Sequence, residues 1–308
     1  MNIAIIGRSE LLYESAKLIS KYHTIKLIIT SKESPEYAIT SADFKKLAIS
    51  LGAKFLKTTK LEKAEISPLV IKNNIQIGIS VNYNVIIKQE IIDLFKLGIL
   101  NAHGGDLPRY RGNACQAWAI LNGEKKIGLC IHKMVGNKVD YGDIISREYL
   151  KINLKTKIND VYNWMNNVIP ELFVNSINKL ESNPYYFLEK QSENPQHSLR
   201  CYPRKPEDAR INWNLMDIEI IRLINASGKP YDGAFCYLNN TKVYVLDAEL
   251  FNDEEVFLAI PGQILKVVDK GIIVSTGNNK KILIKKIRYL NNEIPPIGII
   301  KSLRTRLN

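Results

Sequence analysis

The sequence predicts an α/β fold in which a doubly wound, mostly parallel sheet is followed by a small antiparallel β-barrel domain. Two observations predict it. Up to residue 103, short strand-like segments rich in β-branched residues alternate with segments of helical spacing, which is typical of a parallel sheet with helices on its faces. Beyond residue 230, only strand-like segments remain, at the spacing of a small antiparallel barrel. The 308 residues are enough for two such domains.

The first predicted domain, residues 1–200, starts with five strands that alternate with helices. In the first helical segment, apolar residues such as Leu12, Ala16 and Ile19 recur at helical spacing. Pro170 is expected to kink the last and longest helix of the domain. The predicted strands are 2–7, 24–30, 52–58, 75–81 and 97–103, with an edge pair at 127–135 and 143–152; the predicted helices include 11–22, 41–51, 88–95, 113–123 and 157–182.

The second half of the chain has a different texture. Residues 201–215 contain two prolines and no periodicity, which predicts a linker. One helix at 216–227 then begins the second predicted domain, residues 216–308. Its predicted strands are 233–239, 242–250, 262–269, 271–276 and 281–290.

Composition excludes some classes of protein. The net charge of +12 would suit a nucleic-acid partner, but the basic residues are dispersed and only 11 of 43 are Arg, so nucleic acid is disfavoured. No run of 18 apolar residues predicts a membrane span, and the first residues do not resemble a signal peptide. Four scattered cysteines predict reduced thiols and a cytoplasmic location.

The turn after the first strand, GRSELLYES, tests for dinucleotide binding. It lacks the second and third glycines of the G-x-G-x-x-G pattern, which disfavours an NAD enzyme. Arg8 and Ser9 nevertheless stand where a helix begins, and the N–H groups there attract anions. They are therefore expected either to contact a phosphate or simply to cap the helix.

The segment NAHGGDLPRYRGNACQAW, residues 101–118, contains the candidate catalytic residues Asn101 and His103. Asn101 and His103 are two residues apart on a strand, so their side chains point the same way, at the strand end where open α/β sheets bind ligands. An amide that stabilises an oxyanion beside an imidazole that moves a proton is suited to reaction at an acyl carbonyl. The alternative is a structural histidine, which the adjacent glycines and Asn101 make the weaker interpretation.

Three motifs in order resemble the 10-formyltetrahydrofolate-dependent formyltransferases. They are NAH at 101–103, LPRYRG at 107–112 and VDYGD at 139–143. The resemblance implies a Rossmann-like catalytic domain followed by an OB-like barrel. It also implies that Asn101, His103 and Asp140 are catalytic. His103 would be the base, Asn101 the oxyanion donor and Asp140 the group that orients the imidazole and stabilises its cation. An ordinary turn residue is the alternative for Asp140.

The resemblance further implies N10-formyltetrahydrofolate as formyl donor, with no metal. GGDLP and the absence of a basic, glycine-rich insertion at 30–48 favour the sugar-nucleotide N-formyltransferases over the methionyl-tRNA enzyme. The acceptor would be the amine of a nucleotide-linked sugar, most often a dTDP- or UDP-4-amino-4,6-dideoxy sugar for surface polysaccharides such as O-antigen, and a homodimer is expected. Methionyl-tRNA formyltransferase is the alternative; a formyltetrahydrofolate hydrolase or folate-binding protein, and a nucleic-acid-binding module, are further alternatives.

Other residues are assigned binding roles. Arg109 and Arg111 are suited to grip acceptor phosphates, although Arg111 would equally brace its loop. Gly105 would let the acceptor or the loop approach closely. Tyr231 would stack on a nucleotide base or pack between domains. The resemblance implies that the folate pterin ring binds largely to main-chain atoms of one segment, together with Asp140. The residues of that segment are Asn82, Tyr83, Asn84, Val85 and Ile86. The alternative is that this segment is a strand end and loop with no role in ligand binding.

Overall fold

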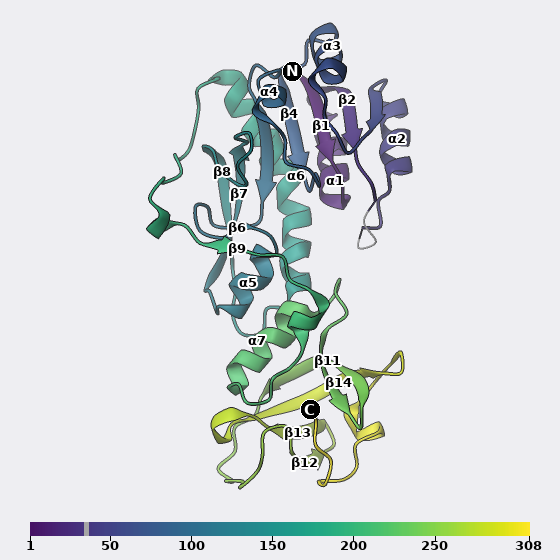
Figure 1. Ribbon diagram of the computed structural model, residues 1–308, viewed down its shortest axis with the longest axis vertical. Helices are drawn as coiled ribbons and strands as arrows, with labels where there is room; N and C mark the ends of the chain where they lie inside the picture. Colours follow the sequence, from purple (N-terminus) through teal and green to yellow (C-terminus); the bar gives the residue numbers. More distant parts are fainter. Residues whose placement is uncertain (34–36) are drawn as a thin grey trace. The chain divides into compact units, whose positions relative to one another are not determined.

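The computed structural model describes residues 1–33 and 37–308 (Figure 1). Residues 34–36, part of the segment in which the sequence showed no basic insertion, lie outside the described residues. The chain forms two compact units. The first contains Met1–Cys115, Ile127–Leu150 and Tyr162–Cys201; the second contains Gln116–Lys126, Lys151–Val161 and Tyr202–Asn308.

The first unit is built on a seven-stranded sheet in the order β3-β2-β1-β4-β5-β7-β8. The pairs among β3, β2, β1, β4 and β5 are parallel, and β5 pairs antiparallel with β7. The central strands are buried along their length because helices cover them, which explains their continuous apolar sequence. The strands are β1 Asn2–Gly7, β2 Thr24–Thr30, β3 Lys54–Lys57, β4 Ile77–Val81, β5 Ile99–His103, β7 Lys126–Lys133 and β8 Ile144–Lys151.

Helices connect the parallel strands (Figure 1). The predicted mixed α/β architecture is confirmed, with small differences. The helix predicted at 88–95 is only the single turn α4, whereas the long helix predicted at 157–182 is confirmed as α6, which contains Pro170. The helices are α1 Glu10–Ile19, α2 Ser41–Ser50, α3 Lys63–Lys72, α4 Gln89–Ile92, α5 Cys115–Leu121 and α6 Ile158–Ser182.

A two-stranded parallel sheet joins distant segments of the first unit. In it, β6 (Arg111–Gly112) pairs with β9 (Arg200–Cys201). The sequence showed neither strand, because two residues are too short for a periodic pattern. The pairing matters for the site, because β6 follows directly on the loop after His103.

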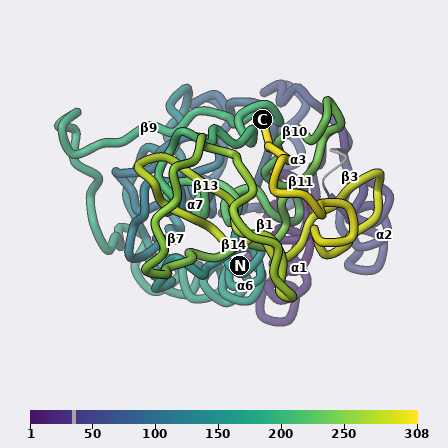
Figure 2. Tube along the Cα trace, turned by 90° about the horizontal axis from the view of Figure 1, so that it is seen from below, coloured from purple at the N-terminus to yellow at the C-terminus, as the bar shows by residue number. Residues whose placement is uncertain are grey.

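The second unit contains α7 (Asp217–Ser227) and an antiparallel sheet in the order β10-β11-β14-β13-β12, with β15 paired to β14. The predicted antiparallel domain is confirmed. Its strands lie in the green to yellow part of the trace in Figure 2. A core of Trp213, α7 and strand residues holds it together. The strands are β10 Ala234–Leu238, β11 Thr241–Leu250, β12 Ile264–Val268, β13 Gly271–Ser275, β14 Lys281–Tyr289 and β15 Asn292–Ile294.

Two segments before residue 200 also belong to the second unit. The Trp118 indole donates to the Tyr202 carbonyl at 3.0 Å, and the Asn225 amide donates to the Leu154 carbonyl at 2.6 Å. The sequence-based division at residue 200 therefore differs from the grouping of these segments, because contacts between distant segments leave no local pattern.

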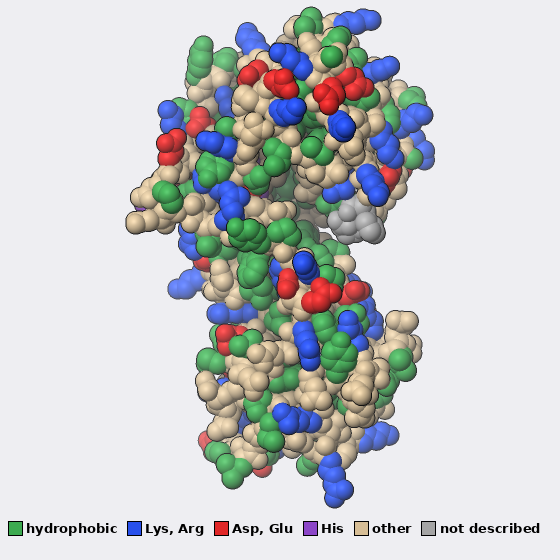
Figure 3. Space-filling model, viewed as in Figure 1, with side chains coloured by type: hydrophobic (Ala, Val, Ile, Leu, Met, Phe, Trp, Pro, Cys, Tyr) green, Lys and Arg blue, Asp and Glu red, His purple; other side chains and the backbone are tan. Residues whose placement is uncertain are grey.

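The face of the molecule drawn in Figure 3 carries charged side chains of both signs. Figure 3 shows Lys and Arg interspersed with Asp and Glu over the visible face. Among the described residues, no helix has both the length and the apolar character that a membrane crossing requires. The four cysteines are buried and free.

Candidate active site

The centre of the site is the carboxyl end of β5. Asn101 and His103 alternate along this strand with Ala102, so their side chains lie on one face of the sheet, as predicted. His103 is 8% exposed, and Asn101 is half-buried. The strand lies inside the sheet because β4 and β7 flank it, with Asn101 opposite Ser80 on one side and His132 on the other.

The two ring nitrogens of His103 have different partners. Nε2 lies 2.6 Å from the Tyr110 carbonyl oxygen, and Nδ1 lies 3.4 Å from Oδ1 of Asp140. A carbonyl oxygen only accepts hydrogen bonds, so Nε2 must carry a proton. Nδ1 is therefore the nitrogen that can take up a further proton, and the carboxylate beside it stabilises the resulting cation. The structure thus brings His103 and Asp140 together.

Asp140 sits in a tight turn between β7 and β8. Its backbone has a left-handed φ of 61°, and Gly142 follows at 107°. The side chain is 9% exposed. Its Oδ2 accepts a hydrogen bond from the Gly112 N–H at 2.8 Å, which leaves Oδ1 directed at the histidines. The carboxylate is therefore held by the backbone at β6 and aimed at the imidazole from the turn.

His132 is a further residue at this centre, and the sequence analysis did not assign it a role. Its Nδ1 lies 3.0 Å from the Lys133 carbonyl oxygen and 3.1 Å from that of Tyr141, so Nδ1 carries the proton. Its Nε2 therefore accepts a hydrogen bond from the Asn101 amide, with Nδ2 and Nε2 3.2 Å apart.

The charge state of His132 follows from its surroundings. The ring is 1% exposed, and burial lowers the pKa of His132 below its ordinary value, although Asp140 acts in the opposite direction. His132 is thus neutral near pH 7 and orients Asn101. The signal in the sequence was a lone imidazole directly after the apolar segment 127–131 of a predicted strand.

Gly105 explains why the loop after His103 begins with glycines. A Cβ at this position would lie 2.6 Å from Nε2 of His103 and would also collide with the Tyr110 carbonyl oxygen. The close approach predicted for Gly105 is therefore made by the chain itself. Glycine at this position lets the loop fold back, so that the Tyr110 carbonyl oxygen accepts a hydrogen bond from the His103 imidazole and fixes its orientation.

The segment predicted to hold folate is a loop between β4 and α4. Val85 is 39% exposed and Ile86 58%, whereas the Tyr83 hydroxyl donates to the Thr58 carbonyl at 3.0 Å. Burial raises the pKa of Tyr83 to about 12, so this hydroxyl stays neutral. Asn82 and Asn84 are exposed. Two adjacent exposed apolar side chains therefore border the carboxyl edge of the sheet.

Arg8 joins this loop to the first turn. Its Nε donates to the Asn82 carbonyl at 3.1 Å, and another guanidinium nitrogen donates to the Lys32 carbonyl at 2.9 Å. Ser9 is 1% exposed, and Asn82 lies over it with Nδ2 3.4 Å from its Oγ. Ser9 makes no side-chain capping bond to α1. In this arrangement Arg8 shapes the loop at Asn82, while Ser9 lies beneath it.

Arg109 and Arg111 have different environments. Arg109 is exposed and lines a pocket of about 350 Å³ with Arg147, Lys190 and His197. Arg111 is 3% exposed, and its guanidinium bonds with Gln191 and lies 3.7 Å from the Tyr141 ring centroid. The geometry of Arg111 is that of a residue that braces its loop, the second of the two roles left open by the sequence.

Tyr231 belongs to the second unit, where this residue is 43% exposed.

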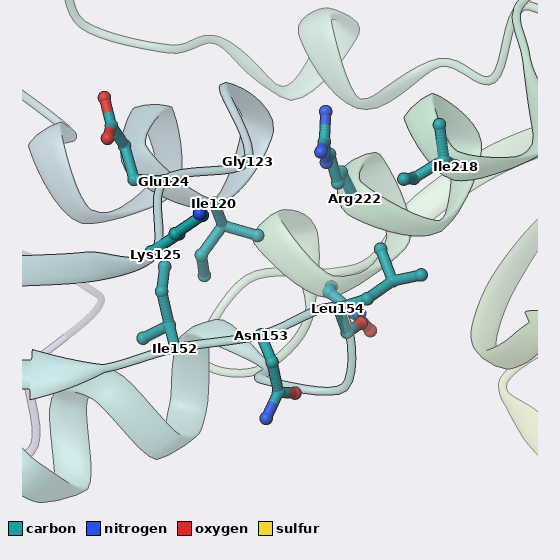
Figure 4. A pocket seen from close by; sticks show the side chains of 10 residues that line it. Ile120, Gly123, Glu124, Lys125, Ile152, Asn153, Leu154, Ile218 and Arg222 are labelled. Carbon is teal, nitrogen blue, oxygen red and sulfur yellow. Dashed lines mark hydrogen bonds between the residues drawn. The ribbon is translucent and has the colours of Figure 1, made fainter.

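The second unit contains a pocket of about 220 Å³, shown in Figure 4, between the end of α5, the segment 152–154 and α7. Arg222 lies against Gly123 at this pocket. Asn225 is buried there, and its amide closes one wall through its bond to Leu154.

The described part of the chain has no group of three or more His, Cys, Asp or Glu side chains placed to hold a metal ion. The assembled centre instead offers an imidazole nitrogen that accepts a proton, a carboxylate beside it and an oriented carboxamide. These groups are suited to attack of an amine on an acyl carbonyl.

Comparison with known proteins agrees with this chemistry. The formyl transferase family matches residues 1–177, and the formyl transferase C-terminal domain family matches residues 204–297. The chain belongs to the formyl transferase family, and its enzymatic class is therefore that of a formyltransferase. It is 30% identical over 294 residues to the methionyl-tRNA formyltransferase of Clostridium tetani, covering 94% of this chain and 92% of that protein.

Solved structures share the fold over nearly the whole chain. One is WlaRD, a sugar 3N-formyl transferase in the presence of dTDP and 5-N-formyl-THF, at 24% identity and a TM-score of 0.67, covering 95% of this chain and 98% of WlaRD. Another is the N-formyltransferase from Helicobacter canadensis in complex with folinic acid and dTDP-3-aminofucose. It is 22% identical with a TM-score of 0.68, covering 92% of this chain and 98% of that one.

Proposed function

We propose that this formyltransferase moves the formyl group of N10-formyltetrahydrofolate to the amine of a nucleotide-linked amino sugar. The acceptor class we favour is a dTDP- or UDP-linked 4-amino-4,6-dideoxy sugar. The observation that supports acyl transfer to an amine is the arrangement of His103 Nδ1 beside Asp140 and of Asn101 held by His132. The sequence motifs named three of these residues, and we assign each a distinct task that its contacts support.

The tasks follow from the contacts. Asn101 uses one amide hydrogen on His132 and has the other to donate to the formyl oxygen as negative charge develops there. His103 holds its proton on Nε2 against Tyr110, so Nδ1 accepts the proton that the attacking amine loses. Asp140 stabilises the imidazolium that results. The bond between the formyl carbon and N10 then breaks, N10 takes the proton back from the His103 imidazolium, and tetrahydrofolate leaves without any covalent bond to the protein.

Folate binding is assigned to the loop at 82–86. Its neighbour in space is the turn that carries Asp140, because the Gly136 N–H donates to the Gln89 side chain at 2.8 Å and the Asn137 N–H to the Ile87 carbonyl at 3.4 Å. Exposed Val85 and Ile86 supply an apolar surface for a planar ring, and the main chain of the loop supplies its polar partners. The donor would therefore lie beside the proposed catalytic groups. WlaRD and the Helicobacter canadensis enzyme, which share the fold, were crystallised with formylated folates.

The connection between β2 and α2 supports a sugar acceptor over tRNA. It consists of residues 31–40, which carry one Lys and two Glu. The methionyl-tRNA formyltransferases of this family have a basic, glycine-rich insertion at this point of the chain, which would contact phosphates. A connection with more acidic than basic side chains is less suited to attract phosphates. We assign the acceptor's diphosphate instead to Arg109, which lines a pocket with Lys190.

A second candidate is methionyl-tRNA formyltransferase, which the 30% identity with the Clostridium tetani enzyme favours. A third is hydrolysis of the formyl donor, in which water replaces the amine. An acceptor screen separates the three. The purified protein is incubated with N10-formyltetrahydrofolate and, in parallel, with 3-amino and 4-amino sugars linked to dTDP, UDP or GDP, with charged initiator tRNA, or with no acceptor.

Mass spectrometry of the acceptor and release of tetrahydrofolate are the two readouts. We expect a gain of one formyl group on an amino-sugar nucleotide and little release without acceptor. Formylation of methionyl-tRNA at a rate comparable with the best sugar would contradict the proposal. Equal release of tetrahydrofolate with and without acceptor would indicate a hydrolase.

We also propose that the enzyme works in the cytoplasm as a homodimer and supplies formylated sugars for surface polysaccharides such as the O-antigen of lipopolysaccharide. Light scattering during gel filtration tests the dimer, with a mass near 70 kDa expected, about twice the 35.1 kDa of one chain. A mass equal to one chain at micromolar concentration would contradict it.

A further inference from the structure

Gln191 is a polar residue that neither the sequence motifs nor the proposed reaction uses. It lies between α6 and β9, in a segment that has little regular structure. It is half-buried, and its side chain points to the turn that carries Asp140. Its position in the chain, 51 residues after Asp140, gives no hint of this contact.

The Gln191 carboxamide is fully used in hydrogen bonds. Its Oε1 accepts from two nitrogens of Arg111, at 3.1 and 2.7 Å. Its Nε2 donates to the carbonyl oxygens of Asp140 at 3.0 Å and Gly142 at 2.9 Å. A guanidinium only donates and a carbonyl only accepts, so the amide has one possible orientation. The polar atoms of the Gln191 side chain are therefore already engaged within the protein.

These bonds close a ring around the catalytic turn. Arg111 and its neighbour Gly112 hold opposite ends of Asp140, because Arg111 acts through Gln191 on the Asp140 backbone while the Gly112 N–H bonds the carboxylate. Arg111 also lies against the ring of Tyr141. Burial lowers the pKa of Arg111, whose ordinary value is so high that the guanidinium keeps its charge.

The turn needs such support. Asp140 is not a glycine, yet its φ of 61° is left-handed, a conformation that costs free energy unless the surroundings impose it. Fastening the carbonyls on both sides of Tyr141 imposes it. The same conformation fixes where the carboxylate points, and so its 3.4 Å separation from Nδ1 of His103.

We infer that Gln191 is a positioning residue: with Arg111 it clamps the Asp140 turn and sets the carboxylate against His103. The inference rests on the proposed function, in which Asp140 stabilises the His103 cation. It assigns Arg111 to this clamp rather than to acceptor phosphates.

Four variants test the clamp. Gln191→Ala removes it, and Gln191→Glu keeps the bond to Arg111 but replaces both donors to the turn with a carboxylate oxygen. Asp140→Asn removes the charge that the clamp positions, and the double variant Gln191→Ala/Asp140→Asn tests whether the two act together. Gln196→Ala is the matched control, since Gln196 is an exposed glutamine on the same segment.

The first measurement needs no acceptor. His103 is one of four histidines, so its imidazole resonances can be assigned by NMR. We expect Asp140→Asn to move them, Gln191→Ala and Gln191→Glu to move them in the same direction, and the double variant to move them no further than Asp140→Asn. Gln196→Ala leaves them in place. Unmoved His103 resonances in both Gln191 variants, with a response to Asp140→Asn, would overturn the clamp.

The second measurement is kinetic, with the amino-sugar nucleotide that the acceptor screen identifies. Misplacing a catalytic group costs up to about a hundredfold in rate, so we expect kcat of Gln191→Ala to fall by about tenfold to a hundredfold. Both KM values should stay within about threefold, because no substrate contact is removed. The acidic limb of the pH profile should shift as in Asp140→Asn, and the double variant should be no slower than Asp140→Asn.

Other outcomes are decisive as well. A merely structural role of Gln191 would give a lower melting temperature, an unchanged pH profile, and losses of kcat from the two single variants that add in the double variant. That result would overturn the inference. Failure of both Gln191 variants to fold would do the same. Failure of the proposed acceptor, in contrast, shows in the wild-type enzyme alone, while the NMR comparison among variants remains valid.

Discussion

The Asn101 side chain and the His132 ring meet across the β5–β7 pair, with Nδ2 and Nε2 3.2 Å apart. Because two carbonyl oxygens hold the proton of His132 on Nδ1, its Nε2 can only accept, and the amide of Asn101 must face it. The orientation of the proposed oxyanion donor is thus set by a buried neutral imidazole.

The first prediction concerns the two residues on β5. His103→Asn should lower kcat by about a hundredfold or more, the scale of losing a general base. Asn101→Ala removes the proposed oxyanion donor, so the transition state should lose about 3 kcal/mol of stabilisation and kcat should fall accordingly. Steady-state kinetics with the identified acceptor measures both. Folate binding, followed by fluorescence, should remain near normal, and near-full turnover of His103→Asn would disprove its role as the base.

The second prediction is a pH dependence of stability from His132. Its pKa is lowered in the folded state, so below the ordinary value of about 6.5 the unfolded chain binds a proton that the folded chain does not. Stability should therefore fall as pH drops below that value, by about 1.4 kcal/mol per pH unit until the lowered folded pKa is reached.

The matching variant is His132→Gln, measured by urea unfolding between pH 7.5 and 5. Glutamine does not titrate, so the slope should become shallower by the contribution of one proton. Burial also lowers the pKa of His23, so His23→Gln serves as the comparison and should remove its own share only. An unchanged slope in His132→Gln would show that His132 is not held neutral by the fold.

The third prediction concerns Gly105. In Gly105→Ala, the new Cβ must displace the Tyr110 carbonyl or the His103 ring, which breaks the bond that fixes the proton on Nε2. We expect kcat to fall by about tenfold or more, since a wrong tautomer or a shifted base slows proton transfer. Gly228→Ala is the control, because its Cβ would meet only the Ile224 carbonyl oxygen at 3.9 Å. Equal activity of the two variants would be inconsistent with this packing.

The fourth prediction uses salt to separate acceptors. Binding of tRNA through many phosphates should weaken by about a thousandfold between low and moderate salt. A sugar nucleotide has one diphosphate held locally, so its KM should change far less. We expect the shallow dependence with the best amino-sugar nucleotide, measured between 50 and 200 mM salt. A steep dependence of turnover would favour a nucleic-acid substrate, for which the charge of +12 would then have a function.

The sequence by itself determined the layers of the fold and the proposed catalytic residues. Strand and helix periods are local, so β1 to β5, α6 and the strands β10 to β14 were predicted close to their observed bounds, whereas the three-residue strand β15 was not predicted. Asn101, His103 and Asp140 were found because their motifs are contiguous or closely spaced. A family relationship preserves such spacing.

Only the tertiary structure decided how these residues are held. His132 reaches Asn101 because β5 and β7 pair in one register, and Gln191 reaches the Asp140 turn from beyond α6. The sequence left two roles open for Arg111, phosphate binding and bracing of its loop. In the folded chain Arg111 is buried and donates to Gln191. Hydrogen bonds between segments far apart in the chain depend on strand register and loop closure. Neither leaves a periodic signal in the sequence, so these partners appear only once the chain is folded.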